Sequence, residues 1–368
     1  VCFNKKQQME WNGEGRDCGM LKIAVVEDQQ EVRDELCRFI RQYAAENSLQ
    51  VEVLPIEDGA VIAEHYEPGY DIIFMDVEMP GKSGPEFLRE YIPQHPVPVI
   101  LVSSLNLRVF DALDAGAVDF IQKPQNHGDR DAFITALAQK VLVAATAKVR
   151  MARPAAPTAV DAAGAKPFPP LGANPALNNV LIGLGASTGG TEATLEVMKR
   201  LPEDIPGMVI VQHMPPGFTK MYAERLNRLC KMEVREARNG DEIHRGLALV
   251  APADLQARVV RIGNRYTLSC VPGEKVSGHR PSVDAMFQSM SETVRCKMVG
   301  IIMTGMGQDG AAGLLAMRKK GAYTIGQDKA SSVVYGMPMV AHDIGAVCTQ
   351  ASCEDIAGVL IRHLKGLA

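Results

Sequence analysis

Three acidic side chains follow apolar runs in the first third of the chain. Glu27 and Asp28 come directly after IAVV, and Asp76 comes directly after IIFM. Because the carboxyl ends of parallel strands form the ligand crevice of an open α/β sheet, we expect the three acids to converge there. Clustered oxygen ligands suit a hard cation such as Mg²⁺, beside which one carboxylate could serve as the nucleophile towards a phosphoryl group.

Two further strand ends supply complementary chemistry. Ser103 follows VILV and offers a hydroxyl, and Lys123 follows VDFIQ and offers an ammonium group for phosphoryl oxygens. Phe120 is an aromatic residue near the same rim. A single acid or lysine at a strand end is usually only solvated. Four chemically complementary strand ends in one domain instead favour a pocket for phosphoryl transfer.

A second kind of chemistry is suggested by GASTG at residues 185–189. As G-x-S-x-G it is the elbow that exposes a nucleophilic serine, Ser187. Together with Gly183 it is also a loose relative of the glycine-rich turn that binds a dinucleotide. That turn requires an acid about 20 residues later, at the end of the second strand. Here the second strand ends at Gln212 and His213, so the cofactor interpretation is weakened and a histidine base becomes available.

A serine hydroxyl is a weak nucleophile unless a base takes its proton, and a third group must orient that base. His213 closes one predicted strand and Ser187 follows the preceding one, so both are expected at one edge of the sheet. Asp309, in IIMTGMGQDG, follows a third strand and is the best-placed carboxylate to hold the imidazole. Backbone N–H groups of Thr188 and of the turn near Met306 are the candidate oxyanion donors.

Other histidines and acids fit these roles less well. His279, in SGHRPSVD, lies in a polar loop and could contact substrate instead of acting as the base. Asp284 and Asp328 rank behind Asp309, and helix capping is the structural explanation for Asp284. Three further histidines lack placement at a strand end: His244, His342 and His363.

The elements that must position these residues repeat along the chain. Short apolar runs alternate with amphipathic segments between residues 21 and 143, and again between 180 and 366. Continuous apolar strands separated by helices indicate a parallel sheet covered on both faces. At 368 residues the chain also exceeds the usual size of one core. We predict two doubly wound, mainly parallel-sheet α/β domains, the second with an inserted hairpin around Gly263 and Asn264.

Composition indicates the nature of the remaining segments and the kinds of partner to expect. Residues 144–179 are rich in Ala, Pro and Gly and are predicted to be a linker, and residues 1–20 an extension. The first residues lack the apolar core of a signal peptide, and no apolar run approaches the roughly 18 residues that span a bilayer. A net charge of −4 gives no basic footprint for nucleic acid, and eight scattered cysteines are typical of reduced thiols. We therefore expect a cytoplasmic protein without membrane insertion or a nucleic-acid partner.

The first domain resembles the receiver domains of two-component response regulators. The motifs VVED, FMDVEMPGKSG, VSS and IQKP carry this resemblance over nearly all of residues 21–143. It implies a flavodoxin-like fold in which Asp76 becomes an aspartyl phosphate, with a histidine kinase as phosphodonor. The residues implied for Mg²⁺ are Glu27, Asp28, Asp76 and the backbone carbonyl of Glu78. Those implied for the switch are Ser103 and Phe120, with Lys123 pairing with the phosphoryl group.

The second domain resembles the catalytic domain of the chemotaxis methylesterases, the CheB family. The motifs GASTGGTEA, QHMPPGFT, HRPSVD, MTGMGQDGA and QDKASSVVYGMP carry this resemblance over about residues 180–365. It implies a Rossmann-like three-layer fold that hydrolyses glutamyl γ-methyl esters, and deamidates certain glutamines, on methyl-accepting chemotaxis receptors. The implied triad is Ser187, His213 and Asp309, with Thr188 and Met306 near the oxyanion and no cofactor at the esterase site.

The resemblance further implies that the unphosphorylated receiver inhibits the esterase and that phosphorylation of Asp76 relieves the inhibition. Two alternatives from other classes stay open, a receiver-linked cofactor-binding protein and a regulator that acts by protein contact alone. A related enzyme that serves a signalling array other than the one for swimming is equally compatible with the residues.

Overall fold

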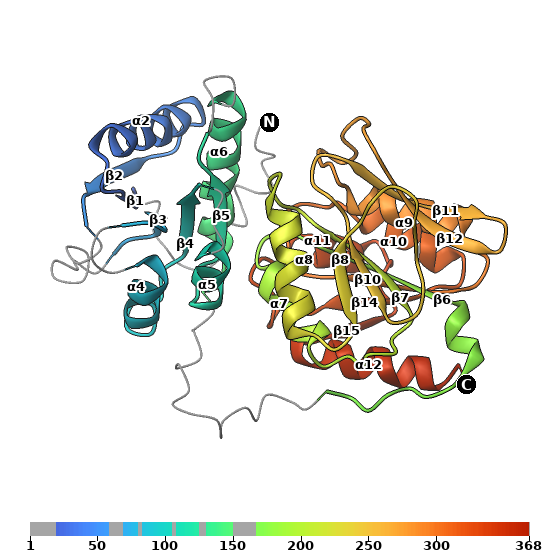
Figure 1. Cartoon of the computed structure of the whole chain (residues 1–368). Coiled ribbons are helices and arrows are strands. Elements are labelled where there is room, and N and C mark those ends of the chain that lie inside the picture. Colours follow the sequence, from blue (N-terminus) through green and yellow to red (C-terminus); the bar gives the residue numbers. More distant parts are fainter. Residues whose placement is uncertain are drawn as a thin grey trace. The chain divides into compact units, whose positions relative to one another are not determined.

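The computed structural model describes residues 20–58, 69–79, 83–104, 108–124, 130–149 and 167–367 (Figure 1). The chain divides into two compact units, with the boundary between Ala156 and Pro157. Each unit is built on a parallel sheet with helices on its faces, so the predicted α/β class is confirmed for both. No helix within the described ranges is long and apolar enough to cross a membrane.

The first unit contains a five-stranded parallel sheet in the order β2-β1-β3-β4-β5. Because β1 lies between β2 and β3, the chain leaves β1 on one side and returns on the other, which opens a crevice at the carboxyl ends of β1 and β3. The strands are β1 (Leu21–Val26), β2 (Val51–Ile56), β3 (Ile72–Asp76), β4 (Val99–Ser103) and β5 (Asp119–Gln122). The helices are α2 (Gln30–Glu46), α4 (Gly84–Tyr91), α5 (Arg108–Asp114) and α6 (Arg130–Thr146).

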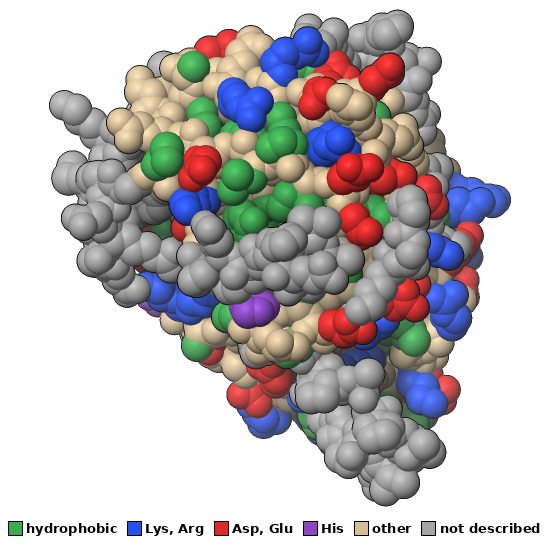
Figure 2. Space-filling model, turned by 90° about the vertical axis from the view of Figure 1, so that its left-hand side faces the viewer, with side chains coloured by type: hydrophobic (Ala, Val, Ile, Leu, Met, Phe, Trp, Pro, Cys, Tyr) green, Lys and Arg blue, Asp and Glu red, His purple; other side chains and the backbone are tan. Residues whose placement is uncertain are grey.

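Local sequence explains these elements. Helix α2 buries the apolar stripe Leu36, Phe39 and Ile40, which has helical spacing, and packs on β1 and β2. Helix α4 begins with a capping box in which the Glu86 carboxylate accepts from the backbone N–H and the hydroxyl of Ser83. Acidic and basic side chains are interspersed over the described part of the face shown in Figure 2.

The second unit contains a seven-stranded parallel sheet in the order β15-β14-β13-β6-β7-β10-β8. The strands are β6 (Val180–Ala186), β7 (Gly207–Gln212), β8 (Glu233–Glu236), β10 (Leu247–Val250), β13 (Lys297–Ile302), β14 (Tyr323–Gln327) and β15 (Thr349–Ala351). Helices α7 (Gly190–Met198), α8 (Phe218–Leu229) and α12 (Cys353–Lys365) cover one face (Figure 1). Helices α9 (Val283–Thr293), α10 (Ala311–Lys319) and α11 (Met337–Asp343) cover the other.

The predicted hairpin around Gly263 and Asn264 is confirmed. Strands β11 (Gln256–Ile262) and β12 (Arg265–Val271) pair antiparallel, and Ile262 lies opposite Arg265 across the two-residue turn. The short strand β9 (Asp241–Glu242) adds to β12, which gives a separate three-stranded sheet beside the parallel one.

Two glycines of the GLGASTG segment have a packing role. Gly183 and Gly185 both lie within β6, and a Cβ added at Gly183 would be 2.8 Å from Met290 Sδ. A Cβ added at Gly185 would be 2.1 Å from Val283 Cγ1. The two glycines therefore let α9 pack closely on β6. Only Gly189, with φ of 73°, adopts the left-handed backbone of the turn that follows.

The predicted linker, residues 144–179, overlaps both units. Helix α6 continues to Thr146. Near the other end of the linker, the backbone N–H groups of Leu171 and Gly172 donate to the Asp204 carboxylate, each at 2.9 Å. Arg245 binds the same carboxylate at 2.8 Å and the Gly172 carbonyl at 2.6 Å. The stretch from residue 167 onward is thus tied to the second unit. The short 3₁₀ helix η2 (Pro175–Asn179) leads from this stretch into β6.

Candidate active site and acidic pocket

Three strand ends of the second unit bring Ser187, His213 and Asp309 to one edge of its sheet. Ser187 follows β6, His213 follows β7, and Asp309 lies in the loop between β13 and α10. Strand β6 has β7 and β13 as its two neighbours, so these ends are adjacent. The His213 backbone N–H donates to the Ala186 carbonyl at 3.2 Å, and that of Ser187 donates to the Thr304 carbonyl at 3.0 Å.

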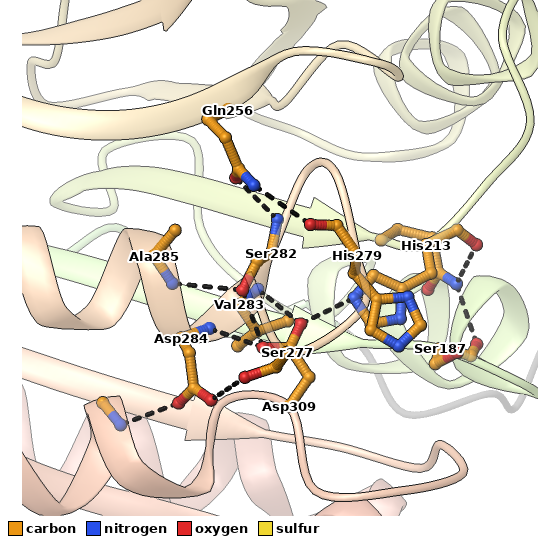
Figure 3. Close-up of polar contacts among 12 residues, drawn as sticks. Ser187, His213, Gln256, Ser277, His279, Ser282, Val283, Asp284, Ala285 and Asp309 are labelled. Carbon is orange, nitrogen blue, oxygen red and sulfur yellow. Dashed lines mark hydrogen bonds and ion pairs between the residues drawn. The ribbon is translucent and has the colours of Figure 1, made fainter. Parts of the chain in front are cut away.

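The His213 ring is bound to Asp309 through one nitrogen. Its Nε2 lies 2.9 Å from Oδ2 of Asp309, whose side chain is buried (Figure 3). An ionised carboxylate can only accept, so Nε2 must be the donor and Nδ1 carries the lone pair of the neutral ring. Within the described part of the chain, Nδ1 is buried and has no hydrogen-bond partner. His213 therefore presents a base atom that Ser187 Oγ does not reach in this structure.

Asp309 is held by the amino terminus of α9. It accepts from the Ser282 hydroxyl at 2.7 Å and from the backbone N–H groups of Val283 at 2.8 Å and Asp284 at 2.9 Å (Figure 3). Burial by itself raises the pKa of Asp309. The hydrogen bonds from His213, Asp284 and Ser282 lower it by a larger amount, so the pKa lies below its ordinary value. The carboxylate is consequently ionised at neutral pH.

The backbone at Ser187 is held by the buried side chain of Gln212. Its Nε2 donates to the Ser187 carbonyl at 2.8 Å and to the His213 carbonyl at 3.3 Å. The Gly190 backbone N–H donates to the same Ser187 carbonyl at 2.8 Å. Gln212 thus joins the two strand ends, a role that was not predicted from the sequence. Its only signal there is a polar residue that ends an otherwise apolar strand.

The two predicted oxyanion segments flank Ser187. Thr188 is buried, and its carbonyl accepts from the Thr304 hydroxyl at 2.9 Å. Gly305 precedes Met306 and lies against the serine, since a Cβ added at Gly305 would be 2.8 Å from Ser187 Cβ. The use of these backbone N–H groups as oxyanion donors stays a prediction.

The structure also places the lower-ranked candidates. The Asp284 carboxylate accepts from the Gly313 backbone N–H and from the Ser277 hydroxyl, each at 2.8 Å, while Ser282 is the N-cap of α9. Asp328 instead holds a turn through the backbone and hydroxyl of Ser331.

His279 does reach the site, because its ring stacks on His213 with centroids 3.8 Å apart and 8° between the planes. The three histidines that lack placement at a strand end bind or stack elsewhere: His244 at Arg245, His342 at Asp343 and His363 at Tyr323.

In the first unit, the carboxylates of Glu27, Asp28 and Asp76 converge as predicted by their strand ends. Each offers an oxygen within 4.8 Å of the others. Lys123 Nζ lies 2.7 Å from Glu27 Oε2 and 2.7 Å from Asp76 Oδ2. Glu27 Oε1 and Asp28 Oδ1 are buried without a hydrogen-bond partner in the described residues. Because such orphaned oxygens are costly, this donor set fits a hard cation such as Mg²⁺.

Lys123 offsets part of the negative charge in this pocket. Burial by itself lowers the pKa of Lys123. The carboxylates of Asp76 and Glu27 raise it by a larger amount, so the pKa lies above its ordinary value and the ammonium group stays protonated. Burial also raises the pKa of Glu27, and Lys123 opposes that shift. Ser103 and Phe120 are buried on the neighbouring strands β4 and β5, and the backbone N–H of Glu78 donates to Asp76 Oδ1 at 3.2 Å.

Comparisons with known proteins match both units. The family model for the CheB methylesterase matches residues 182–360, and that for the response regulator receiver domain matches residues 23–135. A protein-glutamate methylesterase/protein-glutamine glutaminase 2 of Syntrophomonas wolfei is 44% identical over 94% of this chain and 98% of its own length. A protein-glutamate methylesterase/protein-glutamine glutaminase of Escherichia coli O157:H7 is 39% identical over 94% and 97%.

A solved structure, the catalytic domain of the Thermotoga maritima CheB methylesterase, covers 50% of this chain and 97% of its own, with 32% identity and a TM-score of 0.49. The two units and the two curated relatives define the class of protein, a response-regulator receiver domain joined to a hydrolase domain. The chain belongs to the CheB family of protein-glutamate methylesterases/protein-glutamine glutaminases.

Proposed function

We propose that the second unit hydrolyses glutamyl γ-methyl esters on methyl-accepting chemotaxis receptors, with Ser187, His213 and Asp309 as a catalytic triad. One observation carries the proposal: Asp309 binds Nε2 of His213 and leaves Nδ1 buried and unpartnered, at the sheet edge where Ser187 follows β6. The names of the relatives, protein-glutamate methylesterase/protein-glutamine glutaminase, support the substrate class.

In the proposed reaction, Ser187 Oγ attacks the ester carbonyl carbon and its proton passes to His213 Nδ1. Asp309 stabilises the imidazolium that forms, and the N–H groups of Thr188 and of the Met306 turn bind the oxyanion. The bond to the methoxy oxygen then breaks, and His213 returns the proton so that methanol leaves. A water molecule attacks the acyl-serine by the same route and regenerates Ser187. With a glutamine side chain, ammonia leaves in place of methanol.

For the first unit we propose regulation by phosphorylation. A histidine kinase donates a phosphoryl group to Asp76, and Lys123 binds one of its oxygens. The residues that would hold Mg²⁺ are Glu27, Asp28 and Asp76 with the carbonyl of Glu78. When bound, the ion neutralises charge as the phosphoryl group is transferred. Ser103 and Phe120 then change position as the switch, and the esterase rate of the second unit rises.

Methanol release from methylated receptors tests the chemistry. The full chain should release methanol, and Ser187→Ala should lower kcat by roughly 10⁴- to 10⁶-fold, because the nucleophile is lost. His244→Ala is a matched control, since its exposed ring lies outside the proposed machinery. Release that survives in Ser187→Ala would refute the nucleophile assignment.

The same preparations decide between the proposal and its rivals. Saturable binding of NAD(P) in calorimetry would favour a cofactor-binding protein. Full adaptation of receptors by a Ser187→Ala, His213→Ala double variant would favour a regulator that acts by contact alone.

A further inference from the structure

We propose that His279 is a positioning residue for His213, whose ring plane it fixes by stacking. The inference rests on the proposed function. The two imidazoles lie 3.8 Å apart at their centroids with only 8° between their planes, so one ring covers a face of the other (Figure 3). His279 comes from the loop between β12 and α9, far in sequence from the three proposed triad members.

The His213 ring needs a second restraint. Among the described residues its ring nitrogens have one partner, the Asp309 carboxylate at Nε2, while Nδ1 has none. A ring held at one atom can tilt about that hydrogen bond, and tilting moves the Nδ1 lone pair away from the serine. Proton transfer requires this lone pair to point at the hydroxyl. A flat ring at 3.8 Å opposes tilting towards its side and shields that face from water.

The loop that carries His279 is itself firmly held. The backbones of Val276 and His279 exchange two hydrogen bonds, at 2.9 and 3.0 Å. Gln256 Nε2 donates to the His279 carbonyl at 3.0 Å. Arg280 Nη1 donates to the Gly273 carbonyl at 2.7 Å, and its guanidinium also pairs with Asp254. A ring mounted on such a loop is suited to restrain its neighbour.

One side chain couples this loop to the acid. Besides binding the His279 carbonyl, Gln256 accepts from the Ser282 backbone N–H at 3.1 Å (Figure 3). The Ser282 hydroxyl donates to Asp309 at 2.7 Å. The loop that carries the stacked ring is therefore connected to the Asp309 carboxylate through Gln256 and Ser282.

The test compares full-length wild type with His279→Ala and His279→Phe, and with His244→Ala as the matched surface control. We expect His279→Ala to lower kcat for methanol release by about 10- to 10²-fold, because the base is misplaced, while KM stays unchanged. His279→Phe keeps a flat ring in the stack and should restore most of kcat. Thermal unfolding of each variant identifies any loss caused by misfolding.

Several outcomes would overturn the proposal. A raised KM with unchanged kcat in His279→Ala would mean that His279 contacts substrate instead. A His279→Phe variant as slow as His279→Ala would assign the effect to an imidazole nitrogen and not to the stack. If the folded wild type released no methanol, the proposed function would fail by itself. The positioning role would still be tested by NMR, since the His213 Nε2 proton should exchange faster with water in His279→Ala, and an unchanged exchange rate would refute it.

Discussion

At the scale of single residues, Asp309 links the proposed chemistry to local folding. Its carboxylate binds the base and also accepts three hydrogen bonds from the N-cap and the first turn of α9. A helix amino terminus favours negative charge, so the same contacts that orient His213 also keep the acid ionised. One buried carboxylate thereby sets the tautomer of the base and the start of a helix.

Replacing Asp309 by Asn should therefore affect both activity and stability. Asparagine keeps one carbonyl oxygen, but its NH₂ group cannot accept from the two donors that bind the other carboxylate oxygen. We therefore expect the free energy of unfolding of the second unit to fall by about 1–3 kcal/mol at neutral pH. Loss of the negative charge beside His213, which would stabilise the imidazolium, should also lower kcat by about 10³- to 10⁴-fold. Urea unfolding and methanol release measure the two effects. Asp343→Asn, which makes the same change at an exposed position, is the control. Equal stability of Asp309→Asn and wild type at pH 7 would contradict this account.

The pH dependence of that difference has a definite sign. The pKa of Asp309 is lower in the folded chain than its ordinary value. Its stabilisation is therefore fully present above the unfolded carboxyl pKa of about 3.9, and is lost as the pH falls through the lower folded value. The stability difference between wild type and Asp309→Asn should shrink on acidification below about pH 4. A difference that grows in this range would show that the folded pKa is raised.

At the scale of elements, glycines of β6 allow close packing against α9. Gly185→Ala would place a methyl group 2.1 Å from Val283 Cγ1, at the turn of α9 that holds Asp309. We expect the variant to lose about 1–3 kcal/mol of unfolding free energy from overpacking. Val283→Ala in the same chain removes the opposing methyl groups and should recover much of this loss, which chemical denaturation measures. Additive losses in the double variant would mean that the two positions do not clash.

The sequence predicts those elements that repeat a buried apolar pattern. Strands β6, β7, β10 and β13 are largely apolar runs because helices cover both faces of the sheet. Strand β8 was not predicted, since its sequence EVRE is largely polar and lies at the sheet edge. The role of Gly185 was misassigned to a turn, because a glycine needed for close packing and one needed for a turn look alike in sequence.

The same contrast holds at the candidate sites. Ser187, His213 and the receiver acids could be predicted because strand ends of a parallel sheet converge. The support from Ser282 and Gln256 could not, because it depends on loops whose path no periodicity specifies. Ser282 and Asp309 are 27 positions apart, and only the folded chain brings the hydroxyl to the carboxylate.

At the scale of the whole molecule, the two compact units let phosphorylation and hydrolysis be tested separately. A chain that begins after residue 178 would lack the hydrogen bonds of Leu171 and Gly172 to Asp204. Its low activity would then report damage to the second unit. The comparison that tests inhibition by the receiver therefore needs a chain that begins near Pro157, where the units divide.

A point variant avoids truncation altogether. Asp76→Asn removes the proposed phosphorylation site but leaves Lys123 paired with Glu27 at 2.7 Å, so the first unit should still fold. A small-molecule phosphodonor with Mg²⁺ should raise the methanol-release rate of wild type and leave that of Asp76→Asn at its basal value. The basal rates of the two chains should be similar, because Asp76 lies outside the unit that carries Ser187. Equal stimulation of both chains would show that the phosphodonor acts elsewhere, and a phosphorylated wild type without stimulation would remove the receiver from control of the esterase.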